Sequence, residues 1–190
     1  MVKTRLGVAM CGSFCTFSRV MQEIEHLVQL GYEVTPIMSE TSYSTDTRFG
    51  KAADFVARLE EMTDRPVIHT IAQAEPIGPK KLLDILLIMP CTGNTLGKLA
   101  CGITDTAVTM ACKSHRRNNR PVVIGVSSND SLGASGANIG ALLNQKNLYF
   151  LPMGQDDPVN KENSLVADFS RAAECVEAAL QGRQVQPMLF

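Results

Sequence analysis

Residues 84–105 constrain the fold of this chain more than any other segment. An apolar run that ends at Pro90 predicts a buried strand, and a turn of small and hydroxyl residues follows it. A helix begins directly after the turn, because Leu96, Leu99 and Ala100 fall on one helical face. A strand that turns straight into a helix offers free backbone N–H groups and a partial positive charge. The segment therefore predicts an anion-binding site at the helix start.

The turn carries groups that suit such a site. Gly93 allows a close backbone approach, and Thr92, Asn94 and Thr95 add side-chain donors. An ordinary helix cap is the alternative interpretation, because Thr and Asn are favoured at that position. The segment lacks the lysine of a Walker loop and the glycines of a GxGxxG dinucleotide motif, so neither of these motifs is predicted.

Strand-like and helix-like segments alternate along the chain. Apolar runs predict strands over 5–10, 33–38, 66–70, 84–89, 121–126 and 148–151, and apolar periodicity predicts further helices over 18–30, 49–62, 104–118, 135–144 and 164–180. Segment 39–47 is interpreted as a polar loop, and 74–80 as irregular. Because continuously apolar strands need cover on both faces, we expect an α/β fold. Its sheet is expected to be mostly parallel and doubly wound in three layers, Rossmann-like or flavodoxin-like, within a single domain over residues 1–190.

Polar loops follow four of the expected strands. Ligands of such folds bind beyond the carboxyl ends of the strands. Gly12 and Ser13 follow the first strand, Ser39 follows the second, and Ser127 and Asn129 follow the strand at 121–126. Ordinary turns and loop hydroxyls are the alternative interpretation of each. Together with the turn at 91–95, however, these loops converge on one edge of the sheet and predict a nucleotide-like ligand.

Composition excludes several function classes. The net charge of −1 gives no case for nucleic acid, and no apolar run approaches the length of about 18 residues that a membrane span needs. The six cysteines form no CxxC pair, and no histidine spacing suits zinc, so no metal site is expected. Free cysteines are typical of a reducing, cytoplasmic compartment.

A basic cluster falls at the end of the expected helix 104–118 and just beyond it. Its members are Lys113, His115, Arg116, Arg117 and Arg120. One interpretation is a solvated helix end, where cations favour the negative end of the helix dipole. The other is a site for an anionic substrate or partner.

The turn and the helix after it resemble a known signature. Pro90-Cys91-Thr92-Gly93-Asn94-Thr95, followed by Lys98, Ala100, Gly102, Ile103 and Asp105, is similar to the PASANT pattern of the flavin-dependent cysteine decarboxylase superfamily. That superfamily also includes the flavin prenyltransferases. The resemblance implies that the chain is a flavoprotein domain and binds FMN. It implies flavin contacts for Gly12 and Ser13, an approach of Ser39 to the phosphate, and a place for Asn94 near the substrate carboxylate, as the candidate catalytic residue.

Four more stretches extend the resemblance over nearly the whole chain. Segments 74–84, 104–118, 121–130 and 147–158 look like the B-subunit family of bacterial dipicolinate synthases. This implies an oxidoreductase subunit that needs an A subunit. Together they would form pyridine-2,6-dicarboxylate from a small dicarboxylate, a dihydro- or hydroxytetrahydrodipicolinate precursor. The implied setting is the cytoplasm of the mother cell of a sporulating bacterium.

Two departures from the superfamily argue against cysteine decarboxylation. The decarboxylases carry a PxMNxxM segment, of which only Asn129 is in place in this chain. They also use an upstream histidine as base, whereas His69 is better interpreted as a strand-end histidine. A decarboxylase or flavin prenyltransferase is nevertheless kept as an alternative function. A non-catalytic partner that stabilises the A subunit is a second alternative.

The resemblance also implies a homo-oligomer, a trimer or larger, with FMN at subunit interfaces. The residues that would pack against a neighbour are Ala100, Cys101, Ile103, Ala107, Val108 and Met110. Intrachain core is the alternative interpretation, because periodicity does not distinguish core from interface.

Overall fold

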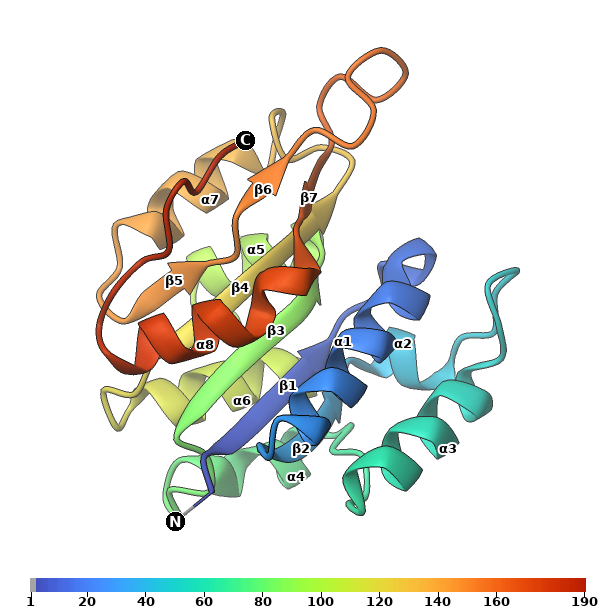
Figure 1. Ribbon diagram of the computed structural model, residues 1–190, viewed down its shortest axis with the longest axis vertical. Helices are drawn as coiled ribbons and strands as arrows, with labels where there is room; N and C mark the ends of the chain where they lie inside the picture. The colour runs from blue at the N-terminus through green and yellow to red at the C-terminus, as the bar shows by residue number, and fades with distance from the viewer. Residues whose placement is uncertain (1–2) are drawn as a thin grey trace.

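A seven-stranded sheet forms the centre of the computed structural model, which describes residues 3–190 (Figure 1). The expected domain starts at residue 1, so its first two residues lie outside the described range. The strands are β1 (Arg5–Met10), β2 (Glu33–Met38), β3 (Ile85–Cys91), β4 (Val122–Ser128), β5 (Leu148–Phe150), β6 (Met153–Gly154) and β7 (Leu165–Ala167). Their order is β2-β1-β3-β4-β7-β6, and β5 pairs with β4 outside this path.

The parallel part of the sheet has the order β2-β1-β3-β4-β5, which is the flavodoxin-like arrangement. This confirms the expected fold class. The sequence reason is plain in β1, β3 and β4, where nearly every side chain is buried because helices cover both faces. The chain runs from β1 outward to β2 and then crosses to β3 on the other side of β1. That reversal creates a crevice at the carboxyl ends of β1 and β3.

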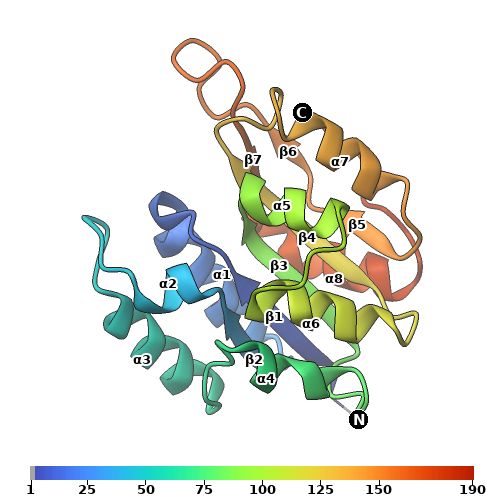
Figure 2. The same ribbon diagram turned by 180° about the vertical axis from the view of Figure 1, so that it is seen from behind.

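Helices cover the two faces of the sheet. On one face lie α1 (Phe17–Gln29) and α8 (Ala172–Leu180), and on the other lie α5 (Gly93–Ala100) and α6 (Ala107–Arg116) (Figures 1 and 2). The remaining α-helices are α2 (Glu40–Ser44), α3 (Ala52–Thr63), α4 (Ile71–Ala74) and α7 (Gly136–Leu143). Short 3₁₀ helices span Phe14–Thr16, Glu75–Ile77 and Phe169–Arg171. Among residues 3–190, no helix has the length and apolar character needed to cross a membrane.

The C-terminal region differs most from expectation. The predicted helix 164–180 is wrong in its first part, because the chain forms β7, then a 3₁₀ turn, and only then α8. In β7, Leu165 and Ala167 are buried while Val166 is half-buried, an alternation typical of a strand. The strand pairs antiparallel with both β4 and β6, so the sheet is mixed at this edge.

Three smaller expectations also need correction. Segment 66–70 is no strand, because only Ile68 bridges to β2 and a capping box at Thr70 then starts α4. Segment 39–47 begins with α2, since the Ser39 side chain accepts a hydrogen bond from the N–H of Ser42 and so caps a short helix. Segment 74–80 contains the end of α4 and a 3₁₀ turn.

Candidate functional site

A cavity of about 650 Å³ lies at the carboxyl ends of β1, β3 and β4, at the crevice that the strand order creates. We call it the strand-end cavity. Its lining includes five of the residues predicted from sequence, which are Gly12, Ser13, Thr92, Ser127 and Asn129. Its size is in the range of pockets that hold a cofactor or a small ligand. The loops after three strands therefore converge as the sequence predicted.

Two serines join loops that the sheet holds apart. Ser13 follows β1 and Ser127 belongs to the end of β4, and β3 lies between these strands. Their hydroxyl oxygens are 2.7 Å apart, which is a good distance for a hydrogen bond between hydroxyls. The buried position of Ser127 fixes one side of this contact. The pair therefore joins the two loops across the end of β3 at the cavity wall.

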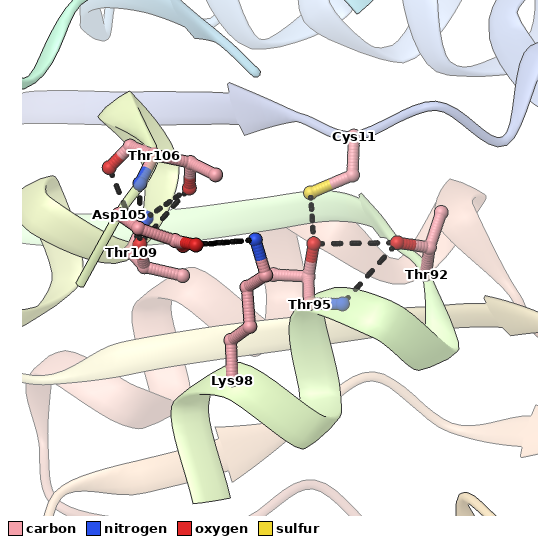
Figure 3. Close-up of polar contacts among 7 residues, drawn as sticks. All are labelled: Cys11, Thr92, Thr95, Lys98, Asp105, Thr106 and Thr109. Atoms are coloured by element: carbon pink, nitrogen blue, oxygen red, sulfur yellow. Dashed lines mark hydrogen bonds and ion pairs between the residues drawn. The ribbon is translucent and has the colours of Figure 1, made fainter. Parts of the chain in front are cut away.

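The start of α5 is tied to the end of β1 by a chain of hydroxyl contacts (Figure 3). The Thr92 hydroxyl accepts from the N–H of Thr95 and donates to the Thr95 hydroxyl at 3.2 Å. The Thr95 hydroxyl donates in turn to the sulfur of Cys11 at 3.3 Å. Thr92 therefore caps the helix, while the N–H groups of Gly93 and Asn94, at the first two helical positions, can have no partner within the helix.

Gly93 is required by close packing. A Cβ atom there would lie 2.6 Å from the hydroxyl of Ser135 and 2.7 Å from both the Ser128 hydroxyl and an Asp130 carboxylate oxygen. Ser128 and Ser135 both donate to that carboxylate, and these hydrogen bonds hold the pKa of Asp130 below its usual value. The loop after β4 is therefore fixed directly against the start of α5.

The spacing of Lys98 and Asp105 within the signature has a structural explanation at the other end of α5. Lys98 donates from its ammonium group to the carboxylate of Asp105 at 2.8 Å (Figure 3). Thr106, the next residue, forms a capping box with Thr109 and so starts α6. The ion pair therefore joins α5 to the residue directly before the cap of α6.

Two cysteines lie behind the cavity wall. Cys11 directly follows β1, Cys91 ends the neighbouring β3, and both are buried. The pKa of the Cys11 thiol is lowered by a hydrogen bond from Cys91, with further help from Thr95, whereas burial raises the pKa of Cys91. Within residues 3–190, no three His, Cys, Asp or Glu side chains gather in a way that could hold a metal ion.

Four predicted site residues do not line the strand-end cavity. Ser39 and Thr95 are buried, where they bond to Ser42 and to Cys11 and Thr92, respectively. Gly93 contacts the loop after β4, as described above, and Asn94 is exposed on the first turn of α5 next to Thr92. Their contact with a ligand stays a prediction.

His69 is likewise outside the lining of the strand-end cavity. Its ring stacks on Tyr43 with a centroid separation of 3.7 Å. Its Nδ1 atom is buried and has no hydrogen-bond partner within residues 3–190. The stacking agrees with a structural role for His69, but the expected strand end is wrong, because segment 66–70 forms only the isolated bridge at Ile68.

Sequence reasoning missed the charged residues of the cavity. Arg19 of α1, Arg48 before α3, and Asp156 and Lys161 between β6 and β7 all line it. Lys161 forms an ion pair with Asp156 at 2.9 Å, whereas Arg19 and Arg48 lie over the rings of Phe169 and Phe49. In the sequence these residues look like ordinary solvated charges, so no local signal identifies them.

The donor set of the cavity fits a phosphorylated ligand with a flat ring. Hydroxyl groups, among them that of the helix cap Thr92, and the cations Arg19 and Arg48 suit anionic groups. The rings of Phe14 and Phe49 add apolar surface to the lining. FMN has this combination of phosphate, polar ribityl chain and flat ring, so the residues present fit the group that the sequence resemblance implies.

Comparison with known proteins agrees with this fit. A family model described as Flavoprotein matches residues 1–162. The chain belongs to the flavoprotein family. It is 46% identical over 185 residues to the dipicolinate synthase B subunit of Bacillus subtilis (strain 168), a match that covers 97% of this chain and 92% of that protein.

Solved structures extend the comparison. The crystal structure of the dipicolinate synthase B subunit from Bacillus halodurans has a TM-score of 0.90 and 44% identity, covering 98% of this chain and 96% of that one. The FMN-dependent cysteine decarboxylase SpaF has a TM-score of 0.69 at 20% identity, covering 94% of this chain and 97% of that one. The second similarity shows the fold alone. The resemblance inferred from the signature and the four further stretches is thereby confirmed.

Proposed function

We propose that this chain is the FMN-binding B subunit of a dipicolinate synthase. With a separate A subunit it forms pyridine-2,6-dicarboxylate from a dihydro- or hydroxytetrahydrodipicolinate precursor in the cytoplasm of a sporulating mother cell. The observation that carries this proposal is the 46% identity to a dipicolinate synthase B subunit over 97% of the chain. Because the match covers nearly the whole chain, it is not confined to the signature at the start of α5.

FMN is assigned to the strand-end cavity. Ser13, Thr92 and Ser127 contribute hydroxyl groups to its lining. The N–H groups of Gly93 and Asn94, which directly follow Thr92 but lie outside the lining, suit the phosphate or another anionic group. When bound there, a flavin supplies a hydride acceptor for oxidation of the precursor ring. The protein itself orients the ligands, because its hydroxyls are fixed by the contacts between Ser13 and Ser127 and between Thr92 and Thr95.

The proposed substrate is a dicarboxylate, so its binding site needs cationic side chains to pair with the two carboxylate groups. Arg19 and Arg48 line the strand-end cavity and form no ion pair among residues 3–190. Their guanidinium groups are free to bind carboxylates in a bidentate manner. Asn94 is exposed beside the cavity wall, where its amide can contact the substrate carboxylate. We assign it that role as the candidate catalytic residue.

The partners are an A subunit and further copies of this chain, as a trimer or larger assembly. Of the residues expected at an interface, Ala107 and Val108 are buried within the chain, whereas Cys101 and Ile103 are exposed. The interface assigned to this region is therefore narrowed to the end of α5 and the turn after it. Light scattering on the purified chain tests this assignment, and a strict monomer that binds FMN tightly would contradict it.

Cofactor identity is tested on the purified chain. We expect a yellow protein whose absorbance spectrum shows a flavin and whose released ligand has the mass of FMN. Titration of the apoprotein should show preference for FMN over FAD and NAD, because one hydroxyl-rich phosphate turn is present and the GxGxxG motif is absent from the turn after β3. A preference for FAD or NAD, or no binding, would overturn the assignment.

Activity is tested with and without the cognate A subunit. We expect little pyridine-2,6-dicarboxylate from the chain alone and much more from the mixture. Turnover of a cysteinyl peptide or of dimethylallyl phosphate would instead favour a decarboxylase or a prenyltransferase. A colourless chain that still raises the activity of the A subunit would favour a non-catalytic, stabilising partner.

A further inference from the structure

A second cavity, of about 470 Å³, lies at the far end of α5. It is bounded by the last turn of α5, the last turns of α6 and the turn before β5, on the face of the molecule seen in Figure 2. We call it the basic cavity, because Lys113, Arg116, Arg117, Arg120 and Lys146 all line it. The eight residues of α5 separate it from the strand-end cavity by about 12 Å along the helix axis.

The charges of the basic cavity are not balanced by the protein. Its lining includes five cationic side chains and no carboxylate. Arg120 forms an ion pair with Asp84 at 3.1 Å, but the other four cations form none among residues 3–190. The chain as a whole has a net charge of −1, so this excess of positive charge is local. The negative end of the α6 dipole offsets only about half of one charge.

The cations come from two elements that are distant in sequence. Lys113, Arg116, Arg117 and Arg120 belong to the end of α6 and the turn after it, whereas Lys146 precedes β5 and contributes from a separate element. The two turns are joined, because the Asn147 side-chain amide donates to the backbone carbonyl of Asn119 at 2.9 Å. The arrangement therefore differs from a plain solvated helix end, whose cations would come from one segment.

The rest of the lining is apolar or neutral. Leu99 and Ile103 line the cavity from the end of α5, and Ile103 is 46% exposed although it is a large apolar side chain. Cys112 is buried beside them, and burial raises the pKa of its thiol to about 12, so the thiol stays neutral. The cavity thus combines apolar and neutral side chains with five cationic ones.

We propose that the basic cavity binds a small organic polyanion, with at least two carboxylate or phosphate groups on a flat or apolar body. The guanidinium groups of Arg116 and Arg117 suit bidentate binding of these groups, and Lys146 provides a point charge from its own turn. The body of the ligand covers Leu99, and the exposed Ile103, which is also assigned to a subunit interface, borders it. This site is separate from the strand-end cavity and does not rest on the function proposed for it.

The test uses isothermal titration calorimetry on the full chain at constant ionic strength. Two ring-bearing polyanions are used as probes. Pyridine-2,6-dicarboxylate carries carboxylate groups, and adenosine 5′-diphosphate carries phosphate groups. Two further compounds serve as controls. Inorganic pyrophosphate is a polyanion without a flat or apolar body, and benzoate has a ring but only one negative charge. We expect the ring-bearing polyanions to bind at least 10-fold more tightly than pyrophosphate or benzoate. Tighter binding of pyridine-2,6-dicarboxylate would indicate a carboxylate ligand, and tighter binding of adenosine 5′-diphosphate would indicate a phosphate ligand.

Variants locate the binding. The double variant Arg116→Gln/Lys146→Gln should weaken binding of the better probe at least 10-fold and leave the affinity for FMN unchanged. Lys51→Gln, at an exposed lysine before α3, is the matched control and should bind like the parent chain. Arg48→Gln removes a cation from the strand-end cavity, which is itself assigned a dicarboxylate substrate. The titration is repeated in this variant, and the probe binding that remains there is expected to be lost in the double variant.

Three results would overturn the proposal. The first is equal affinity of the double variant and the parent chain for every probe. The second is a loss of probe binding in Arg48→Gln but not in the double variant, which would assign the anion to the strand-end cavity. The third is an altered oligomeric state or a lost A-subunit complex in the double variant, with anion affinity unchanged, which would make the basic cavity a protein interface.

Discussion

The strand-end cavity and the basic cavity lie at the two ends of the same helix, yet they are built differently. The first is lined by backbone, short hydroxyl side chains and charges of both signs, including Asp130 and Asp156. The second is lined by long cationic side chains without a carboxylate. Donors such as the Ser13 and Ser127 hydroxyls are held in place by the protein itself, whereas long side chains lose rotamer freedom when a ligand binds.

The two cavities should therefore bind their ligands with different sensitivities. Binding at the strand-end cavity should depend on small packing details and less steeply on salt, because the fold fixes its hydroxyl donors and fewer unpaired cations line it. Binding at the basic cavity should weaken steeply as salt rises, because exposed charges are screened over about 10 Å at 0.1 M salt. Four experiments test whether the two ends of α5 differ in this way.

The largest effect is expected on the free energy of unfolding when the pH is lowered, and it comes from a histidine near the basic cavity. His115 is buried behind the basic cavity, and its Nε2–H donates to the carbonyl of Pro121 at 3.0 Å. Burial lowers its pKa from 6.5 to about 4. Between these values the unfolded chain binds a proton that the folded chain does not, so the free energy of unfolding falls as the pH falls through this window. The total loss is roughly 3 kcal/mol, because each tenfold difference in proton affinity corresponds to about 1.4 kcal/mol.

Denaturant unfolding of the parent chain and of His115→Gln, from pH 7.5 down to pH 4, measures this loss. The difference in unfolding free energy between the two proteins should shrink or reverse by that amount as the pH falls. Curves that stay parallel over the whole range would show that His115 binds its proton equally well in the folded and the unfolded chain, which would contradict the lowered pKa.

The next largest effect is expected from a small change at the strand-end cavity. Gly93→Val places atoms where Ser128, Asp130 and Ser135 already lie, which should cost about 2 to 3 kcal/mol through overpacking. FMN affinity should fall by roughly 100-fold, or the folded state should be destabilised to a similar extent.

Gly97→Ala on the same helix is the control for this substitution. Its Cβ atom would meet only the Asn138 amide nitrogen, at 3.5 Å, so the change should be neutral or stabilise the helix by about 0.5 to 1 kcal/mol. Equal FMN titrations for the two variants would mean that the start of α5 tolerates displacement and is not a fixed binding element.

A weaker effect is expected from Asn94→Ala. The exposed Asn94 side chain makes no hydrogen bond within residues 3–190, so its removal should leave thermal stability unchanged. Loss of a ligand hydrogen bond should weaken FMN or substrate binding by about 1 to 3 kcal/mol. Asn144→Ala, at an exposed position after α7, is the matched control. Unchanged affinity and activity would show that Asn94 is an ordinary residue at the helix start.

The smallest effect tests the bridge across β3. In a double-mutant cycle of Ser13→Ala and Ser127→Ala, the coupling energy for folding should be about 1 kcal/mol, because one hydroxyl–hydroxyl bond is lost. FMN affinity of each single variant should fall by a few-fold, and the two losses should not add. Strict additivity in both measurements would show that the serines act independently.

Much of the fold was predictable because it rests on local patterns. The strands at 5–10 and 33–38 match β1 and β2 residue for residue, since continuous apolar runs identify buried parallel strands. The short strands β6 and β7 were missed because β7 pairs with β4, which is far away in sequence, and β6 pairs with β7. The hydroxyl-rich side of the site was predictable for the same reason as the strands, but Arg19, Arg48 and Lys161 were not, because only the tertiary fold brings them to the cavity.

The outer edge of β4 is shared between two strands, and this division has a consequence for biosynthesis. Residues 122–124 pair with β5, whereas residues 127 and 128 pair with β7, which ends at Ala167. A ribosome releases the chain from the N-terminus, so β1 to β4 can assemble while part of that edge still has no partner. Unpaired edges recruit strands from other chains. The nascent protein therefore remains vulnerable to aggregation until almost its whole length has been made.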